Sequence, residues 1–368
     1  MDTFKNEFNK IEKRYYSPER ISRIEALKES LSGKTIVLFG AGGLEGDAFW
    51  DNLEAMGLNV ACFADTYAIT SQSGRFPILR PDELIAIYPD ATIIISASTS
   101  YPIIYKQLLE LGYSDTQIIN YPEVRELLPE VNMDNFKLHI EGYEWAYNFF
   151  KDDISKNIIL QRINWYLFAD KLDQSQDVQY FEKDVLTLSE NEVFVDAGFY
   201  TGDTSEEFIR KVKNKYKHIY GFEADKFTIE KCNNFLEENE NITLVAKVLY
   251  SYKTVLKFKS YGNSMSCISD DDTESITRID ATSLDIFFAD KAMQPTFIKM
   301  DIEGGEQDAL LGSKHVIETY KPKLALSVYH KVDDIYKMPQ LIESYRSDYE
   351  YTLRHYTNMI SETIMYAK

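Results

Sequence analysis

Apolar runs and segments with helical periodicity alternate along the first third of the chain. The run TIVLFGAGG, a second run that ends at Asp65 and the run ATIIISAS are separated by such helical segments. Uninterrupted apolar runs are typical of parallel strands that are buried on both faces of a sheet. The pattern predicts a small doubly wound α/β domain over residues 1–120, with one leading helix over residues 1–31.

The pattern changes twice after residue 120. Residues 121–190 have helical periodicity, many large aromatic residues and few glycines, and we interpret them as a helical connector. From residue 191 the alternation resumes, with the strand-like runs EVFVDAG, HIYGFEAD, ITLVAKVLY, TFIKMDIEGGE and KLALSVYH. Two more strands, at about 350–356 and 362–367, close the chain. The predicted fold is therefore α/β, with two doubly wound Rossmann-like domains, residues 1–120 and 191–368, and an antiparallel last strand in the second.

Composition narrows the choice of partners. The formal charge is −19, and a field of this sign repels both nucleic acid and anionic membrane surfaces. The three cysteines, Cys62, Cys232 and Cys267, lie far apart and lack the spacing of a zinc site. No apolar run approaches the roughly 20 residues of a membrane helix, and the N-terminal residues lack the apolar core of a signal peptide. We expect a reduced, cytoplasmic protein that binds neither nucleic acid nor membrane.

The strongest candidate binding site is a glycine loop between a strand and a helix. The strand EVFVDAG contains Asp196 at its end, Gly198 and Gly202 flank the loop, and Asp203 and Thr204 suit the start of the helix. Glycines there let the backbone approach a ligand closely, and the start of a helix offers unpaired N–H groups.

The next strand narrows the choice of cofactor. HIYGFEAD places Glu223 at its carboxyl end, where a carboxylate can accept hydrogen bonds from the ribose hydroxyls of an adenosine. Together with Asp196, Asp203 and Asp225, it makes the crevice anionic, which disfavours the pyrophosphate of a dinucleotide. S-adenosylmethionine carries a sulfonium and an ammonium and no phosphate, so the charge balance favours it as the cofactor.

Further acidic residues and a histidine follow two later strands. Asp301, Glu303 and Glu306 come directly after the run TFIKM, and His330 ends the run KLALSVYH. Ligands of open α/β sheets bind outside the carboxyl ends of the strands, so we expect these side chains to face the same crevice.

These motifs, in this order and spacing, resemble the FkbM-type methyltransferases. The resemblance is carried by VFVDAGFYTGDT, YGFEAD, TFIKMDIEGGE, the glycine of LLGS and LALSVYHK, and it covers about residues 178–368. It implies a class I methyltransferase sheet, S-adenosylmethionine as the methyl donor, and O-methylation of a sugar or another hydroxylated compound. By the same resemblance, Asp301 and Glu303 lie where donor and acceptor meet. The residues expected to bind the donor are Asp196, Gly198, Tyr200, Gly202, Asp203, Thr204, Glu223, Ala224 and Asp301.

Transfer to a hydroxyl gains about 10²–10⁴-fold from a general base. His330 is the first candidate for this base, with Glu303 and Asp301 as rivals. We expect no metal, although the hard oxygen ligands of Asp301, Glu303 and Glu306 could instead hold a divalent cation. Nothing in the sequence distinguishes oxygen from nitrogen acceptors, so an N-methyltransferase acting on an amino sugar or an amino acid stays open.

The first domain carries an incomplete dinucleotide fingerprint. Gly40 and Gly42 follow its first strand and Asp65 ends the next, but Glu45 stands where the third glycine would be. The domain resembles Rossmann-type sensor or nucleotide-sugar-binding modules that are joined to glycan-modifying enzymes. Three roles stay open: a site for a nucleotide-linked acceptor, a scaffold or oligomerisation module, and an NAD(H) site, which would make the chain a nucleotide-sugar oxidoreductase. The expected partners are a small-molecule or glycan acceptor, with or without a nucleotide, and further copies of this chain.

Overall fold

The computed structural model describes residues 3–40, 44–66, 68, 72–73, 76–97, 100–127, 132–259, 267–268 and 276–368. It divides into two compact units: Met1–Ile140 with Leu160–Leu172, and Glu141–Ile159 with Asp173–Lys368. The expected connector over 121–190 is thus shared between the units, and the expected boundaries at 120 and 190 stay predictions. None of the helices in the described ranges combines the length and the apolar character that a membrane span requires.

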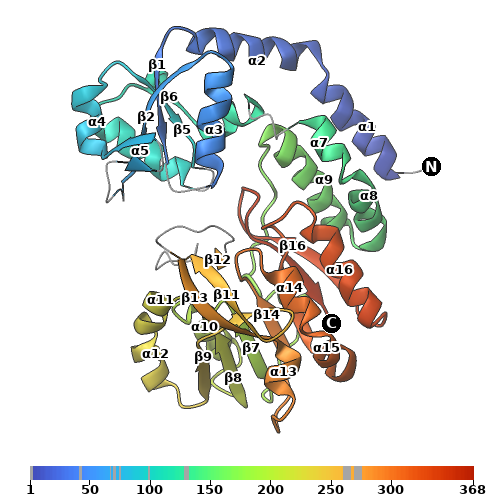
Figure 1. Ribbon diagram of the computed structural model, residues 1–368. Coiled ribbons are helices and arrows are strands. Elements are labelled where there is room, and N and C mark those ends of the chain that lie inside the picture. The colour runs from blue at the N-terminus through green and yellow to red at the C-terminus, as the bar shows by residue number, and fades with distance from the viewer. Residues whose placement is uncertain are drawn as a thin grey trace. The chain divides into compact units, whose positions relative to one another are not determined.

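Unit 1 contains a six-stranded sheet with the order β3-β4-β2-β1-β5-β6 (Figure 1). All neighbours are parallel except β3, which pairs antiparallel with β4. The strands are β1 (Thr35–Phe39), β2 (Asn59–Ala64), β3 (Gln72–Ser73), β4 (Phe76–Leu79), β5 (Thr92–Ile95) and β6 (Ile118–Ile119). The helices before β6 are α1 (Thr3–Tyr15), α2 (Pro18–Leu31), α3 (Leu44–Ala55), α4 (Pro81–Ile87), α5 (Tyr101–Leu111) and the 3₁₀ turn η1 (Asp115–Gln117). The predicted doubly wound domain is therefore confirmed, whereas Gly42 of the fingerprint and the side chain of Glu45 lie outside the part of the chain that the structure describes.

The prediction of one leading helix over residues 1–31 is wrong. The structure has two helices, because Pro18 lacks the N–H that would continue α1 and is suited to the first position of a new helix. The hydroxyl of Ser17 accepts a hydrogen bond from the N–H of Arg20 at 3.2 Å and so caps α2.

Over the described residues, three short helices and then two longer ones follow β6. They are α6 (Tyr121–Val124), η2 (Arg125–Leu127), α7 (Met133–Lys137), α8 (Ile140–Phe149) and α9 (Asp153–Phe168). The helical character predicted for this segment is therefore present, although it ends at Phe168, and residues up to β7 form turns and extended chain.

Unit 2 contains a seven-stranded sheet with the order β16-β17-β15-β14-β7-β8-β9 (Figure 1). Its strands are β7 (Val193–Ala197), β8 (His218–Phe222), β9 (Ile242–Val245), β14 (Phe297–Met300), β15 (Lys323–Ser327), β16 (Tyr351–His355) and β17 (Thr363–Ala367). Five neighbouring strands, β9, β8, β7, β14 and β15, are parallel, and β17 runs antiparallel to both β15 and β16. This confirms the predicted fold class and the antiparallel ending. It also brings the carboxyl ends of β7, β8, β14 and β15 to one edge of the sheet, together with the start of β17.

The remaining elements of unit 2 surround this sheet. The helices are α10 (Asp203–Lys211), α11 (Lys226–Lys231), α12 (Asn233–Glu238), α13 (Leu284–Phe288), α14 (Glu306–Leu311), α15 (Lys314–Tyr320) and α16 (Asp334–Tyr345). A second, four-stranded sheet, which the sequence did not predict as separate, has the order β10-β13-β11-β12. Its strands are β10 (Val248–Leu249), β11 (Thr254–Lys259), β12 (Cys267–Ile268) and β13 (Ile276–Thr282).

Aromatic packing fixes the central strands that carry the site. Phe194 on β7 stacks on Phe208 of α10, with ring centroids 4.5 Å apart, and on Phe297 of β14 at 4.9 Å. All three side chains are fully buried. Burying an aromatic side chain of this size stabilises the fold by roughly 1.5–3 kcal/mol, so the positions of β7, β14 and α10 are strongly determined.

Candidate active site

A loop with three residues in the left-handed backbone region connects β7 to α10. Gly198, Tyr200 and Gly202 have φ angles of 79°, 50° and 90°. At Gly198 there is a second constraint, since a Cβ built there would lie 1.8 Å from the backbone oxygen of Asp301. Only glycine fits where this loop meets the end of β14. Tyr200 adopts the same region despite its side chain, and such strained positions cluster at ligand sites.

Glu223 lies beside this loop, directly after β8. Its Oε2 accepts a hydrogen bond from the N–H of Tyr200 at 2.9 Å, and its Oε1 accepts from the N–H groups of Ala224 and Asp225, both at 2.8 Å. Burial raises the pKa of Glu223, although the three N–H groups act in the opposite direction. Three of the roughly four acceptor positions of the carboxylate are used, which leaves one on Oε2 for a ligand hydroxyl.

Asp196 is buried behind the loop and pairs with a buried lysine. Its side chain is 0% exposed, its Oδ1 lies 3.1 Å from Nζ of Lys299, and its Oδ2 accepts from the hydroxyl of Ser205 at 2.7 Å. Lys299, which is 3% exposed, also donates to the backbone oxygens of Ala197 at 3.2 Å and Gly198 at 2.7 Å. Burial alone would lower the pKa of Lys299, but the neighbouring carboxylates, Asp196 first, raise it. The ammonium group therefore holds the start of the loop in place.

Asp301, the first residue after β14, accepts hydrogen bonds on both carboxylate oxygens. The hydroxyl of Tyr180 donates to Oδ2 at 2.7 Å, and the hydroxyl of Tyr329 donates to Oδ1 at 3.1 Å. Burial alone would raise the pKa of Asp301, but Lys299, His330 and the Tyr180 hydroxyl outweigh burial and lower it. Asp301 is therefore ionised at neutral pH.

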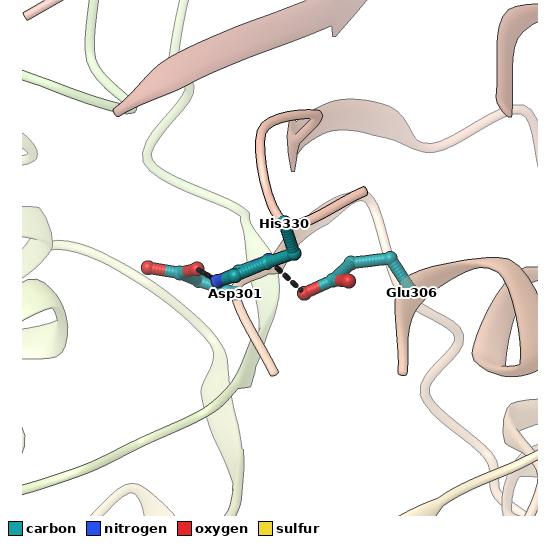
Figure 2. A group of neighbouring side chains, drawn as sticks. All are labelled: Asp301, Glu306 and His330. Carbon is teal, nitrogen blue, oxygen red and sulfur yellow. Dashed lines mark ion pairs between the residues drawn. The ribbon is translucent and has the colours of Figure 1, made fainter. Parts of the chain in front are cut away.

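His330 lies between carboxylates, as Figure 2 shows. Its Nε2 is 3.6 Å from Oδ1 of Asp301, and its Nδ1 is 3.1 Å from Oε1 of Glu306. A third carboxylate, that of Glu303, has its Oε2 3.5 Å from Nε2. Burial alone would lower the pKa of His330, but these carboxylates, Glu306 first, outweigh burial and hold it well above its usual range. At neutral pH His330 therefore already carries the proton that a general base would have to accept.

Three of these side chains, Asp301, Glu306 and His330, are of types that bind metal ions. One ligand atom each of Asp301, Glu306 and His330 can be chosen so that all lie within 4.8 Å of one another, and Glu303 is not part of this group among the described residues. In Figure 2, however, the two carboxylates face different nitrogens of the imidazole ring. A single cation would bind only one of these nitrogens, whereas a protonated imidazole satisfies both carboxylates. We therefore assign these contacts to ion pairs.

A cavity opens at this edge of the sheet. Most residues expected from the sequence line it, namely Gly198, Tyr200, Asp203, Thr204, Glu223, Ala224, Asp301 and Glu303. Asp196, Gly202 and His330 are not part of the lining. Asp196 and His330 form the ion pairs described above. Gly202 ends the loop, where a Cβ would be 2.7 Å from the ring of Phe235. These three residues are close enough to support the lining but do not form it.

Several lining residues were not singled out from the sequence, among them Gln179, Tyr180, Lys299 and Glu362. Lys299 had a signal, because it is the one charged residue inside the apolar run TFIKM, and a charge within a buried strand needs a partner. Gln179 and Tyr180 precede β7, and Glu362 precedes β17. Their positions depend on how loops return to the sheet edge, for which the sequence carries no comparable signal.

Much of unit 2 matches the model of a known protein family. Residues 196–353 match the family model described as Methyltransferase FkbM domain, which confirms the resemblance expected from the motifs. No curated protein matches the chain significantly. The structure of a methyltransferase FkbM from Methylobacillus flagellatus KT has a TM-score of 0.63 at 20% identity, over 93% of this chain and 93% of that chain, and so shares the fold.

Two other similar structures were solved with a bound cofactor. Fibrillarin from Aeropyrum pernix, in complex with S-adenosyl-L-methionine, has a TM-score of 0.34 at 10% identity, over 50% of this chain and 71% of that chain. A putative methyltransferase from Streptococcus mutans, in complex with SAH, has a TM-score of 0.32 at 13% identity, over 50% of this chain and 92% of that chain. Likenesses of this size carry no argument about individual residues.

Proposed function

Because the chain carries a methyltransferase FkbM domain and uses S-adenosylmethionine, we propose that it methylates a hydroxyl group of a sugar or glycan precursor. The observation that carries this proposal is one anionic cavity that joins the loop after β7, the carboxylate of Glu223 and the carboxylates of Asp301 and Glu303. Donor and acceptor can therefore meet within a single site.

The residues present fit the donor. Gly198 leaves space where any Cβ would collide with backbone, and Asp203 and Glu223 place carboxylates on the lining. When bound, S-adenosylmethionine supplies a methyl group on a positively charged sulfur, so an anionic lining stabilises it. We propose that Gly198, Tyr200, Asp203, Thr204, Glu223, Ala224 and Asp301 contact the donor, and that Asp196 and Gly202 hold the loop from behind.

The carboxylates beside the donor site favour a hydroxyl acceptor over an amine. A hydroxyl oxygen must lose its proton as it is methylated, whereas a neutral amine attacks with a free electron pair and needs no base at that step. The cavity also offers the polar side chains of Gln179 and Tyr180, and hydroxylated sugars bind through many hydrogen bonds of this kind. Aligning the acceptor oxygen with the methyl carbon would contribute roughly 7–11 kcal/mol in the best case.

For unit 1 we propose a site for the nucleotide part of a nucleotide-linked acceptor. Its parallel sheet and the left-handed Gly40 after β1, with φ of 117°, support this role. Titration of the full chain with nucleotide-sugars and with NAD(H) tests it. Saturable NAD(H) binding with a change in its absorbance would instead indicate the oxidoreductase, and no binding of either ligand would favour the scaffold.

The methyltransferase proposal is tested on the purified full chain. We expect mass spectrometry to find bound S-adenosylmethionine or S-adenosylhomocysteine, and S-adenosylhomocysteine to form when nucleotide-sugars or free sugars are added. Glu223→Ala should weaken donor binding about 10- to 100-fold, since a hydrogen bond to a charged group contributes roughly 1.5–3 kcal/mol. Glu237→Ala, on the exposed face of α12, is the matched control. Product formation with amino sugars alone would refute the hydroxyl acceptor.

A further inference from the structure

The C-terminal hairpin, which β16 and β17 form, places a carboxylate at the cavity. Because β17 runs antiparallel to β15, it begins at the edge where β15 ends, and Glu362 is the residue directly before it. Glu362 lines the cavity together with Gly198 and Glu223. Its φ angle is 67°, a left-handed conformation that costs a residue with a side chain roughly 1–2 kcal/mol. The backbone oxygen of Glu362 accepts a hydrogen bond from the N–H of Tyr356 at 3.1 Å, which helps to hold this conformation.

The hydrogen bonds around Glu362 leave one carboxylate oxygen able to accept. The side-chain amide of Gln179 donates to Oε2. Oε1 lies 3.4 Å from the hydroxyl of Tyr329, whose single hydrogen has a closer acceptor in Oδ1 of Asp301 at 3.1 Å. Tyr329 therefore donates mainly to Asp301, and Oε1 of Glu362 keeps its capacity to accept a proton.

The three residues that the sequence suggested as bases, Asp301, Glu303 and His330, are less suited to accept a proton. Glu303 pairs with His330, since its Oε2 lies 3.5 Å from Nε2 of the imidazole. Asp301 receives two tyrosine hydroxyls and faces His330, which stabilise its ionised form. His330 is itself protonated between carboxylates and does not line the cavity. Among the described residues, no lysine or arginine forms an ion pair with Glu362, in contrast to Asp196 and its partner Lys299.

The surroundings of Glu362 also raise the pKa of its carboxyl group, as a general base requires. Burial raises its pKa and the charge of Asp301 raises it further, while Gln179, His330 and Tyr329 act in the opposite direction, and the net pKa is raised. A carboxylate whose pKa moves toward the working pH is a more effective general base.

We propose that Glu362 is the general base that accepts the proton of the acceptor hydroxyl during methyl transfer. The inference rests on the proposed hydroxyl acceptor. In the step, the acceptor oxygen forms a bond to the methyl carbon while the sulfur–methyl bond breaks, and its electron pair returns to sulfur, which becomes a neutral thioether. The hydroxyl proton passes to Oε1 of Glu362, and solvent later removes it.

The test compares Glu362→Gln, Glu362→Asp and the control Glu350→Gln. Glu350 lies at the opposite end of the same hairpin, and its side chain is 81% exposed. We expect E362Q to lose about 10²–10⁴-fold in kcat, the usual contribution of a general base, with donor affinity unchanged by calorimetry. E362D should recover part of kcat, and E350Q should match the original chain. Retention of kcat within about fivefold in E362Q would overturn the proposal.

A second measurement does not depend on turnover. Infrared difference titration of the original chain against E362Q should show one protonated carboxyl band that titrates above the usual range of glutamate, and its absence would also overturn the proposal. Because this measurement needs no bound donor, it remains a test of Glu362 even if E362Q binds the donor poorly. If the original chain methylates no hydroxyl compound but the band is present, the proposed function fails while the raised pKa of Glu362 stands.

Discussion

Replacement of Gly198 by Ala tests how closely the donor loop and the end of β14 must approach. The new Cβ would lie 1.8 Å from the backbone oxygen of Asp301, while real Cβ atoms essentially never come within 3.0 Å of another heavy atom. The two backbone segments would therefore have to separate by about 1.2 Å, which is 3.0 Å minus 1.8 Å. A misplacement of about 1 Å near reacting groups can cost roughly 10²-fold in rate. The left-handed φ of 79° adds roughly 1–2 kcal/mol of strain.

We therefore expect G198A to lower kcat/KM at least about 100-fold and to weaken donor binding measured by calorimetry. Gly33→Ala separates the two causes, because Gly33 has a similar φ of 72° but nothing within 4 Å of a built Cβ. It should lower the melting temperature slightly and leave donor binding intact. If G198A bound the donor as well as the original chain and kept its turnover, the close approach would not matter and the assignment of this loop to the donor would be refuted.

Three further outcomes follow from the buried charges. Lys299→Met removes one partner of a buried pair and leaves Asp196 uncompensated, so the free energy of unfolding should fall by about 3–5 kcal/mol, while Lys215→Met at the surface should change it little. His330→Gln should lower the melting temperature most at acidic pH. The folded-state pKa of His330 is raised, so its ion pairs stabilise fully below about pH 6.5, and their contribution is lost as pH rises through the raised pKa. A difference in melting temperature that grows with pH would contradict this sign. EDTA should leave turnover unchanged, and a loss of turnover that Mg²⁺ or Mn²⁺ restores would assign the side chains of Figure 2 to a cation.

The positions that the sequence predicted well share one physical origin. In a parallel sheet, residues that follow the strands gather at one edge, so the runs that end near Asp196, Glu223, Asp301 and His330 are sufficient to bring these side chains together. The residues that sequence reasoning missed arrive differently. Gln179 lies in a turn-rich segment before β7, and its contact with the C-terminal hairpin spans 183 residues of chain. No period or spacing encodes such a contact.

The chemical role of a side chain was harder to predict than its place, because the role depends on the charges around it. A histidine at a strand end is a reasonable base when it stands alone, with a pKa near neutrality. Beside Asp301, Glu303 and Glu306 it becomes a cation, and together with Lys299 it offsets the charge of the buried carboxylates. His330 pairs with Asp301 and Lys299 pairs with Asp196, so these buried charges are compensated while Asp203 and Glu223 on the lining remain available to a positively charged donor. The general base must then be sought among carboxylates that have no such cation, and this criterion selects Glu362 over the residues that the strand ends had suggested.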